Sequence, residues 1–149
     1  MISSLRQRSA WLGGVVVLLV ASAGCDFGHS SPTAPDQSSV QYSQTDLTVG
    51  DGAEATPGST ATVQYGLWLY SDTAADHKGT QVQAQTFSYV VGSTNIIKGF
   101  DMGVAGMKVN GTRRVICPPS LAYGATGDST GTIPPNAALV IDILLTAVQ

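Results

Sequence analysis

Residues 96–145 read IIKGFDMGVAGMKVNGTRRVICPPSLAYGATGDSTGTIPPNAALVIDILL, and this stretch decides the fold. It opens with apolar side chains spaced by three, four and three positions, which places them on one face of a short helix: Ile97, Phe100, Val104 and Met107. Thr94 or Asn95 can cap the start of this helix. Gly99 and Gly103 each cost it about 1 kcal/mol relative to alanine, so packing against other elements must stabilise it.

Strands are predicted both before and after the helix in the sequence. Residues 61–70 alternate in polarity, and one face of the predicted strand carries Val63, Tyr65, Leu67 and Leu69. Further strands are expected at residues 46–49, 86–91, 113–118 and 138–148, and Asn110-Gly111 is typical of a hairpin turn. The fold class is therefore predicted to be α+β, with an antiparallel sheet of about five strands wrapped around one short helix.

The first 24 residues (1–24) are predicted to be an export signal of the lipoprotein type. Arg6 and Arg8 precede an apolar run at residues 12–20, and small residues follow at 21–24. The apolar run is shorter than the ~20 residues that a membrane-spanning helix needs. Export to the bacterial cell envelope is the expectation that follows.

Cys25 lies where a bacterial lipoprotein carries its acylated cysteine, although Ser22 replaces the leucine that this pattern favours. From this position we expect Cys25 to be lipidated. Several acyl chains together would give a stable membrane anchor. Ordinary cleavage after Ala23 is the alternative, and it would leave a soluble secreted or periplasmic protein. Cys117, the other cysteine, alternates with Val115 on a predicted strand and is expected to be buried and unpaired.

Composition sets the domain bounds and excludes several classes of function. Residues 25–44 carry few aliphatic side chains and are predicted to be a flexible tether, which leaves residues 45–149 for one domain. Without Arg6 and Arg8, five basic and ten acidic side chains remain, so nucleic acid binding is not expected. The two histidines lie far apart in the sequence, and we expect neither a metal site nor a cofactor. No dimer motif is visible, so a monomer is expected.

The order of motifs resembles the FKBP family, the macrolide-binding immunophilins that isomerise X-Pro bonds. The resemblance rests on the predicted helix and on three short motifs, Val63-Gln64-Tyr65-Gly66, Ala122-Tyr123-Gly124 and Ile133-Pro134-Pro135. It covers nearly all of residues 45–149. The planar amide is more polar than the twisted one, so the resemblance implies an apolar cleft that lowers the ~18–20 kcal/mol barrier to rotation.

The resemblance carries the family's pocket over residue by residue. The implied catalytic residues are Tyr65, Phe87, Phe100 and Tyr123. Phe100 replaces the usual tryptophan floor, and the hydroxyl of Tyr123 is expected to meet a substrate carbonyl. The implied substrate-binding residues are Ile96, Ile97, Ile133, Ile141 and Val82. Taken singly, Tyr65, Phe87 and Ile141 would more often be core residues.

The sequence departs from the family between Tyr70 and Phe87, where members generally carry a Phe-Asp pair. Alignment on Lys78 to Gln81 places Val82 and Gln83 there, which removes the carboxylate. Alignment by distance from Tyr65 instead offers Ala75-Asp76. We favour the first alignment, which implies an isomerase weaker than a typical member.

The sequence thus predicts a membrane-tethered peptidyl-prolyl cis-trans isomerase that acts on proline-containing, unfolded or partly folded exported polypeptides. A macrolide immunophilin ligand is a candidate binder. The alternatives are a non-catalytic chaperone or peptide-binding module, favoured by the missing Phe-Asp pair, and an envelope scaffold with a vestigial cleft.

Overall fold

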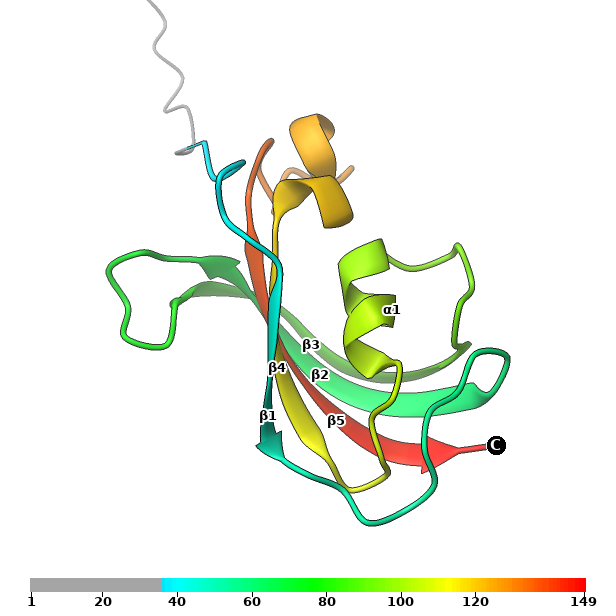
Figure 1. The fold of residues 1–149 in the computed structure, drawn as a ribbon. Helices are drawn as coiled ribbons and strands as arrows, with labels where there is room; N and C mark the ends of the chain where they lie inside the picture. The colour runs from blue at the N-terminus through cyan, green and yellow to red at the C-terminus, as the bar shows by residue number, and fades with distance from the viewer. Residues whose placement is uncertain (1–35) are drawn as a thin grey trace, which may run out of the picture. The chain divides into compact units, whose positions relative to one another are not determined.

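The computed structural model describes residues 36–149, which form a five-stranded antiparallel sheet and one α-helix (Figure 1). The elements are β1 (Ser43–Thr48), β2 (Thr60–Tyr70), β3 (Lys78–Val90), α1 (Lys98–Val104), β4 (Thr112–Cys117) and β5 (Leu139–Val148), with 3₁₀ turns at Pro119–Leu121 and Gly124–Thr126. The strand order is β1-β4-β5-β2-β3. The predicted fold class, a sheet wrapped around one short helix, is confirmed.

The core lies between the concave face of the curved sheet and α1 (Figure 1). The alternation in β2 buries Val63, Tyr65 and Leu67, whereas β5 begins with three consecutive buried residues, Leu139, Val140 and Ile141. From α1, Phe100 and Val104 complete the core.

The helix approaches the sheet closely because two of its inward positions are glycines. A Cβ atom on Gly103 would lie 2.5 Å from a methyl carbon of Val115, and one on Gly99 would overlap the sulfur of Cys117. Both partners are on β4 and are fully buried. Because neither glycine has a side chain, the α1 backbone packs directly against β4.

The predicted side-chain cap at Thr94 or Asn95 is wrong, because α1 begins after Ile97 with no capping side chain. The carboxylate of Asp101 instead accepts the backbone N–H of Gly92 at 2.8 Å. This bond ties the first turn of α1 to the turn that follows β3. A tertiary contact, rather than a side-chain cap, therefore holds the start of the helix.

Two boundaries differ from those expected. Residues 36–44, assigned to the tether, lie against the domain: the Gln37 amide donates to the carbonyl of Tyr70 (3.1 Å) and accepts the N–H of Ala138 (2.8 Å). In addition, β3 begins at Lys78 rather than at residue 86, because its polar first half pairs with β2 as an edge strand. The predicted signal segment and Cys25 lie outside the described residues.

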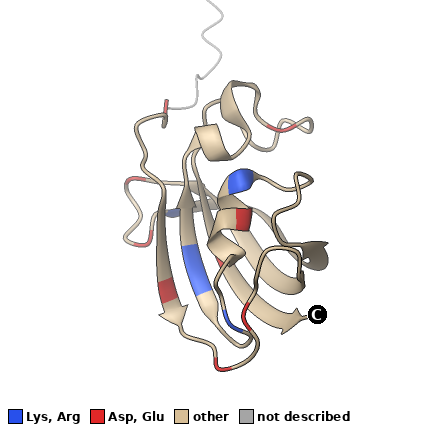
Figure 2. Ribbon diagram, turned by 45° about the vertical axis from the view of Figure 1, so that its right-hand side comes forward, with Lys and Arg blue, Asp and Glu red and all other residues tan. Residues whose placement is uncertain are grey.

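Charged side chains lie at separate places on the described domain rather than in one patch (Figure 2). Arg113 is buried beneath the C-terminal end of α1, where it donates to the carbonyls of Gly103 and Ala105 and pairs with Asp46 at 2.6 Å. Arg114, on the opposite face of β4, pairs with Asp142. Within residues 36–149, no helix has the length and apolarity that crossing a membrane requires.

We predict that Gly99→Ala destabilises the fold by about 1–3 kcal/mol, because the added methyl group overlaps Cys117 and outweighs the gain in helix propensity. Urea unfolding measures the change. Met102→Ala, at an exposed position of the same helix, is the matched control and should change stability little. Replacing Cys117 with alanine in the Gly99→Ala variant should recover part of the loss. A Gly99→Ala variant as stable as the wild type would show that the contact is not tight.

Candidate functional site

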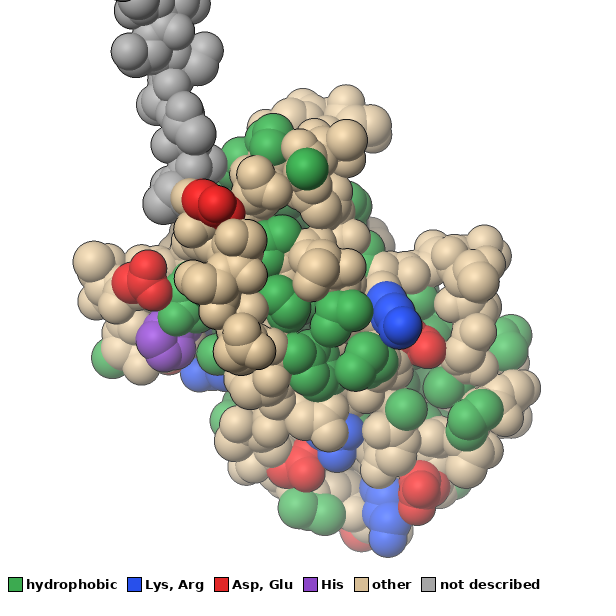
Figure 3. Space-filling view, turned by 45° about the horizontal axis from the view of Figure 1, so that its top comes forward, with side chains coloured by type: hydrophobic (Ala, Val, Ile, Leu, Met, Phe, Trp, Pro, Cys, Tyr) green, Lys and Arg blue, Asp and Glu red, His purple; other side chains and the backbone are tan. Residues whose placement is uncertain are grey.

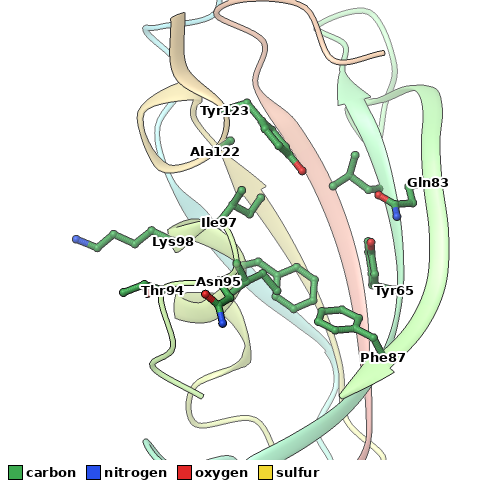
Figure 4. A pocket seen from close by; sticks show the side chains of 12 residues that line it. Tyr65, Gln83, Phe87, Thr94, Asn95, Ile97, Lys98, Ala122 and Tyr123 are labelled. Carbon is green, nitrogen blue, oxygen red and sulfur yellow. The ribbon is translucent and has the colours of Figure 1, made fainter. Parts of the chain in front are cut away.

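A cavity of about 440 Å³ opens between the inner face of the sheet, the start of α1 and the turn at residues 122–123 (Figure 4). Each wall comes from a different element. β2 contributes Tyr65 and Leu67, β3 contributes Gln83 and Phe87, and the remaining lining consists of Thr94, Asn95, Ile96, Ile97, Lys98, Phe100, Ala122 and Tyr123. We call this space the cleft.

The cleft continues along β3. A second cavity of about 540 Å³ shares six of its lining residues with the first and extends past Gln85 to Ser88, Tyr89 and Val90. The two cavities are therefore continuous and form one groove along β3. The space-filling view shows hydrophobic side chains grouped near the middle of one face, framed by polar ones (Figure 3).

Four aromatic rings form the base of the cleft. The ring of Tyr65 meets Phe87 and Phe100 edge-on, with centroids 5.5 and 5.3 Å apart. Tyr89 stacks on Phe87 at 5.6 Å. The pleat explains this cluster, because Val63 pairs with Phe87 and Tyr65 pairs with Gln85, so alternate residues of β3 face α1. Edge-on contacts of this kind fix the ring orientations.

The two phenol groups of the cleft remain uncharged at neutral pH. Burial raises the pKa of the Tyr123 hydroxyl, and the negative charge of Asp128 raises it further. Burial also raises the pKa of Tyr65, an effect that the hydrogen bond from Gln85 partly offsets. Both phenols are therefore protonated donors. Among the described lining residues only Lys98 carries a charge, and its side chain extends away from the base of the cleft (Figure 4).

The arrangement favours binding by shape over acid–base or covalent chemistry. Burial raises the pKa of the Cys117 thiol to about 12, so this thiol stays protonated, and it lies under α1 outside the cleft lining. Residues 36–149 contain no group of three or more His, Cys, Asp or Glu side chains placed to hold a metal ion.

Six of the nine residues predicted for the site line the cleft: Tyr65, Phe87, Ile96, Ile97, Phe100 and Tyr123. The structure places the other three elsewhere. Ile141 is fully buried in the core on β5, and Ile133 is also buried, with its N–H held by the carboxylate of Asp128. Val82 lies at a bulge where the pairing of β3 shifts, and it is half-buried outside the lining.

The structure also places the two residues between which the alignments around the missing Phe-Asp pair differ. Gln83 lines the cleft opposite Tyr123 (Figure 4), whereas Asp76 lies in the 71–77 loop with a carboxylate oxygen accepting the N–H of Lys78. The first alignment, which puts Gln83 at the position of the aspartate, stays a prediction. Gln85 went unrecognised because a glutamine in a polar run gives no periodic signal, whereas Leu67 follows Tyr65 by two positions and was identifiable from the alternation.

Comparison with known proteins agrees with this geometry. The family model described as FKBP-type peptidyl-prolyl cis-trans isomerase matches residues 52–146. The chain is 41% identical over 105 residues to the 46 kDa FK506-binding nuclear protein of Spodoptera frugiperda, covering 70% of this chain and 24% of that one. It is 40% identical over 100 residues to an FK506-binding protein of Neisseria meningitidis, covering 67% and 89%. The N-terminal domain of FKBP42 from Arabidopsis thaliana shares the fold, with a TM-score of 0.62 at 23% identity over 73% of this chain and 87% of that one.

These observations define a protein whose curved sheet and single helix enclose a cleft with an aromatic base and polar groups at its walls. The chain belongs to the FKBP-type peptidyl-prolyl cis-trans isomerase family. It spans less than half the length of the first three curated relatives that it matches.

We predict that Asp76→Ala leaves peptide binding by the cleft unchanged, whereas Gln83→Ala weakens it by about two- to tenfold, as expected for the loss of one hydrogen-bonding group. NMR titration of a proline peptide measures both dissociation constants. Each variant replaces one polar side chain with alanine, Gln83 in the cleft and Asp76 in the 71–77 loop. Weakened binding in Asp76→Ala with no change in Gln83→Ala would reverse the alignment.

Proposed function

We propose that the chain catalyses cis–trans isomerisation of X-Pro bonds in unfolded or partly folded polypeptides of the cell envelope. The observation that carries this proposal is the neutral cleft in which an aromatic base faces the Tyr123 hydroxyl. Family membership agrees with it.

The cleft favours the twisted imide for a physical reason. Resonance makes the planar X-Pro amide more polar than the twisted state, and twisting removes that resonance. Apolar walls withdraw water from the planar state, while Tyr65, Phe87 and Phe100 provide a surface for the proline ring. Ile97 covers the ring from the side of α1. No proton or electron is transferred, so no titrating group or cofactor is needed.

A donor is useful only at certain carbonyls of the substrate. A hydrogen bond to the carbonyl of the rotating imide would strengthen the resonance that must be lost. Donation to a neighbouring carbonyl instead fixes the chain while the imide turns, which is the orientation effect that accelerates reactions within a bound complex. We assign this role to the Tyr123 hydroxyl.

Export and anchoring belong to the same proposal. The basic residues, apolar run and small residues before Cys25 support export, and Cys25 itself supports a lipid anchor. An isomerase held at a membrane would meet polypeptides as they emerge from export. The relatives named for FK506 binding support a macrolide as a competing ligand of the cleft.

A second candidate function is peptide binding without catalysis. Gln83 stands in the cleft where a carboxylate would be expected, and this substitution favours the second candidate. Both functions use the same groove, so affinity alone does not separate them; the rate of rotation does.

The direct test is the rate of cis–trans exchange in a proline peptide, measured by NMR without a coupled protease. We expect the wild-type chain to accelerate exchange and FK506 to abolish the acceleration. Tyr123→Phe should lower kcat/KM by about two- to tenfold without changing the thermal midpoint, because it removes one hydrogen bond and no apolar surface. Binding of the peptide with no acceleration would establish the non-catalytic function. An unchanged rate in Tyr123→Phe would remove the role of that hydroxyl.

Cys25→Ser should release the protein from the membrane fraction, because serine accepts no thioether-linked lipid. Fractionation of cells that express each form measures this, and Cys117→Ser is the matched control at the buried cysteine. If the Cys25→Ser variant still associates with the membrane, the proposed lipid anchor at Cys25 is wrong, and the isomerase proposal is unaffected.

A further inference from the structure

Tyr65 and Gln85 form a polar pair at the second cavity, where the cleft continues along β3. They are directly opposite each other on β2 and β3, and both side chains line the second cavity. The side-chain amide of Gln85 donates a hydrogen bond to the Tyr65 hydroxyl oxygen, with 3.1 Å between nitrogen and oxygen. The edge-on contacts with Phe87 and Phe100 hold the phenol ring, so the hydroxyl oxygen has a fixed position.

The direction of this hydrogen bond determines whether the Tyr65 hydroxyl can still donate its own hydrogen. A tyrosine hydroxyl has one hydrogen to donate and lone pairs to accept with. Because Gln85 occupies the accepting side, the hydrogen remains available, and within residues 36–149 no group accepts it. Burial raises the pKa of Tyr65, so the hydrogen stays on the oxygen.

The hydroxyl that carries this hydrogen faces the cleft. Tyr65 and Tyr123 stand on opposite walls, and both hydroxyls are turned towards the space between them (Figure 4). Tyr123 likewise has no hydrogen-bond partner for its hydroxyl among the described residues. The cleft therefore presents two donors from two walls, one on a strand and one on a turn.

We propose that Gln85 is a positioning residue that makes Tyr65 a second donor for the bound X-Pro segment. By holding the oxygen of Tyr65 through its amide hydrogen, Gln85 directs the phenolic hydrogen to a carbonyl of the polypeptide. Tyr65 and Tyr123 then fix carbonyls on the two sides of the bond that turns. This inference rests on the proposed isomerase function and deepens it.

The charge-bearing isostere of glutamine tests the direction of the bond. A carboxylate has no hydrogen to donate, so in Gln85→Glu it would accept the Tyr65 hydrogen and turn the donor away from the cleft. We expect Gln85→Glu and Tyr65→Phe to lower kcat/KM by the same factor, about two to ten. The double variant should show no further loss, because both changes remove the same donor.

Gln83→Glu is the matched control. It introduces the same charge into the same cleft, from the same strand, at a position with no hydrogen bond to Tyr65. Its effect on the rate should be the same in the wild-type and the Tyr65→Phe backgrounds. Thermal unfolding of every variant separates these effects from loss of the fold.

A pH profile of the rate distinguishes the proposed positioning role of Gln85 from a structural role. Protonating the introduced carboxyl restores a hydrogen that can be donated to Tyr65, so the rate of Gln85→Glu should recover as the pH falls. The wild type and Tyr65→Phe carry no such group at this position and should show no such recovery.

Three results would overturn the inference: wild-type kcat/KM in Gln85→Glu, wild-type kcat/KM in Tyr65→Phe, or multiplied losses in the double variant. Failure of the proposed function looks different, because the wild-type chain would then accelerate nothing. In that case the peptide dissociation constants of Gln85→Glu, Tyr65→Phe and the double variant are measured instead. Because the two changes remove the same donor, we expect equal losses of affinity in the single variants and no further loss in the double variant.

Discussion

The close contact between α1 and β4 is the constraint on which the rest of the structure depends. Gly99 and Gly103 let the helix backbone lie against Cys117 and Val115, and no larger residue fits at Gly99 without displacing its neighbours. This spacing places Phe100 under the cleft and brings Ile97 to its wall. The cost of two glycines in a seven-residue helix is recovered by packing, which is why the helix exists only as part of the domain.

The site follows from that packing and from the pleat of β2 and β3. Alternate residues of the two strands turn towards α1, and beside the N-terminal end of the helix they enclose a groove instead of a filled core. Aromatic rings supply its base, and neutral amides and phenols supply its polar groups. The base of the cleft thus buries no unpaired charge, which would carry a large desolvation cost.

Sequence patterns predicted the elements with strong periodicity and missed those without it. The alternation of β2 and the spacing of Phe100 and Val104 identified the buried faces. The polar first half of β3 gave no apolar alternation, so its pairing, and with it the placement of Gln85, came only from the structure. A period of two also cannot distinguish a cleft wall from a filled core. Ile141, which the family resemblance assigned to the site, lies on the same face of the sheet as Tyr65 but is fully buried.

The position of β1 has a mechanical consequence. It forms one edge of the sheet, while β3, which borders the groove, forms the other, and β4, β5 and β2 lie between them. Tension applied through the N-terminal side of the domain would be borne first by Gln37 and by the pairing of β1 with β4. Because Tyr70, the acceptor of the Gln37 amide, is the last residue of β2 and pairs with Lys78 of β3, part of that load would pass to the strand beside the groove.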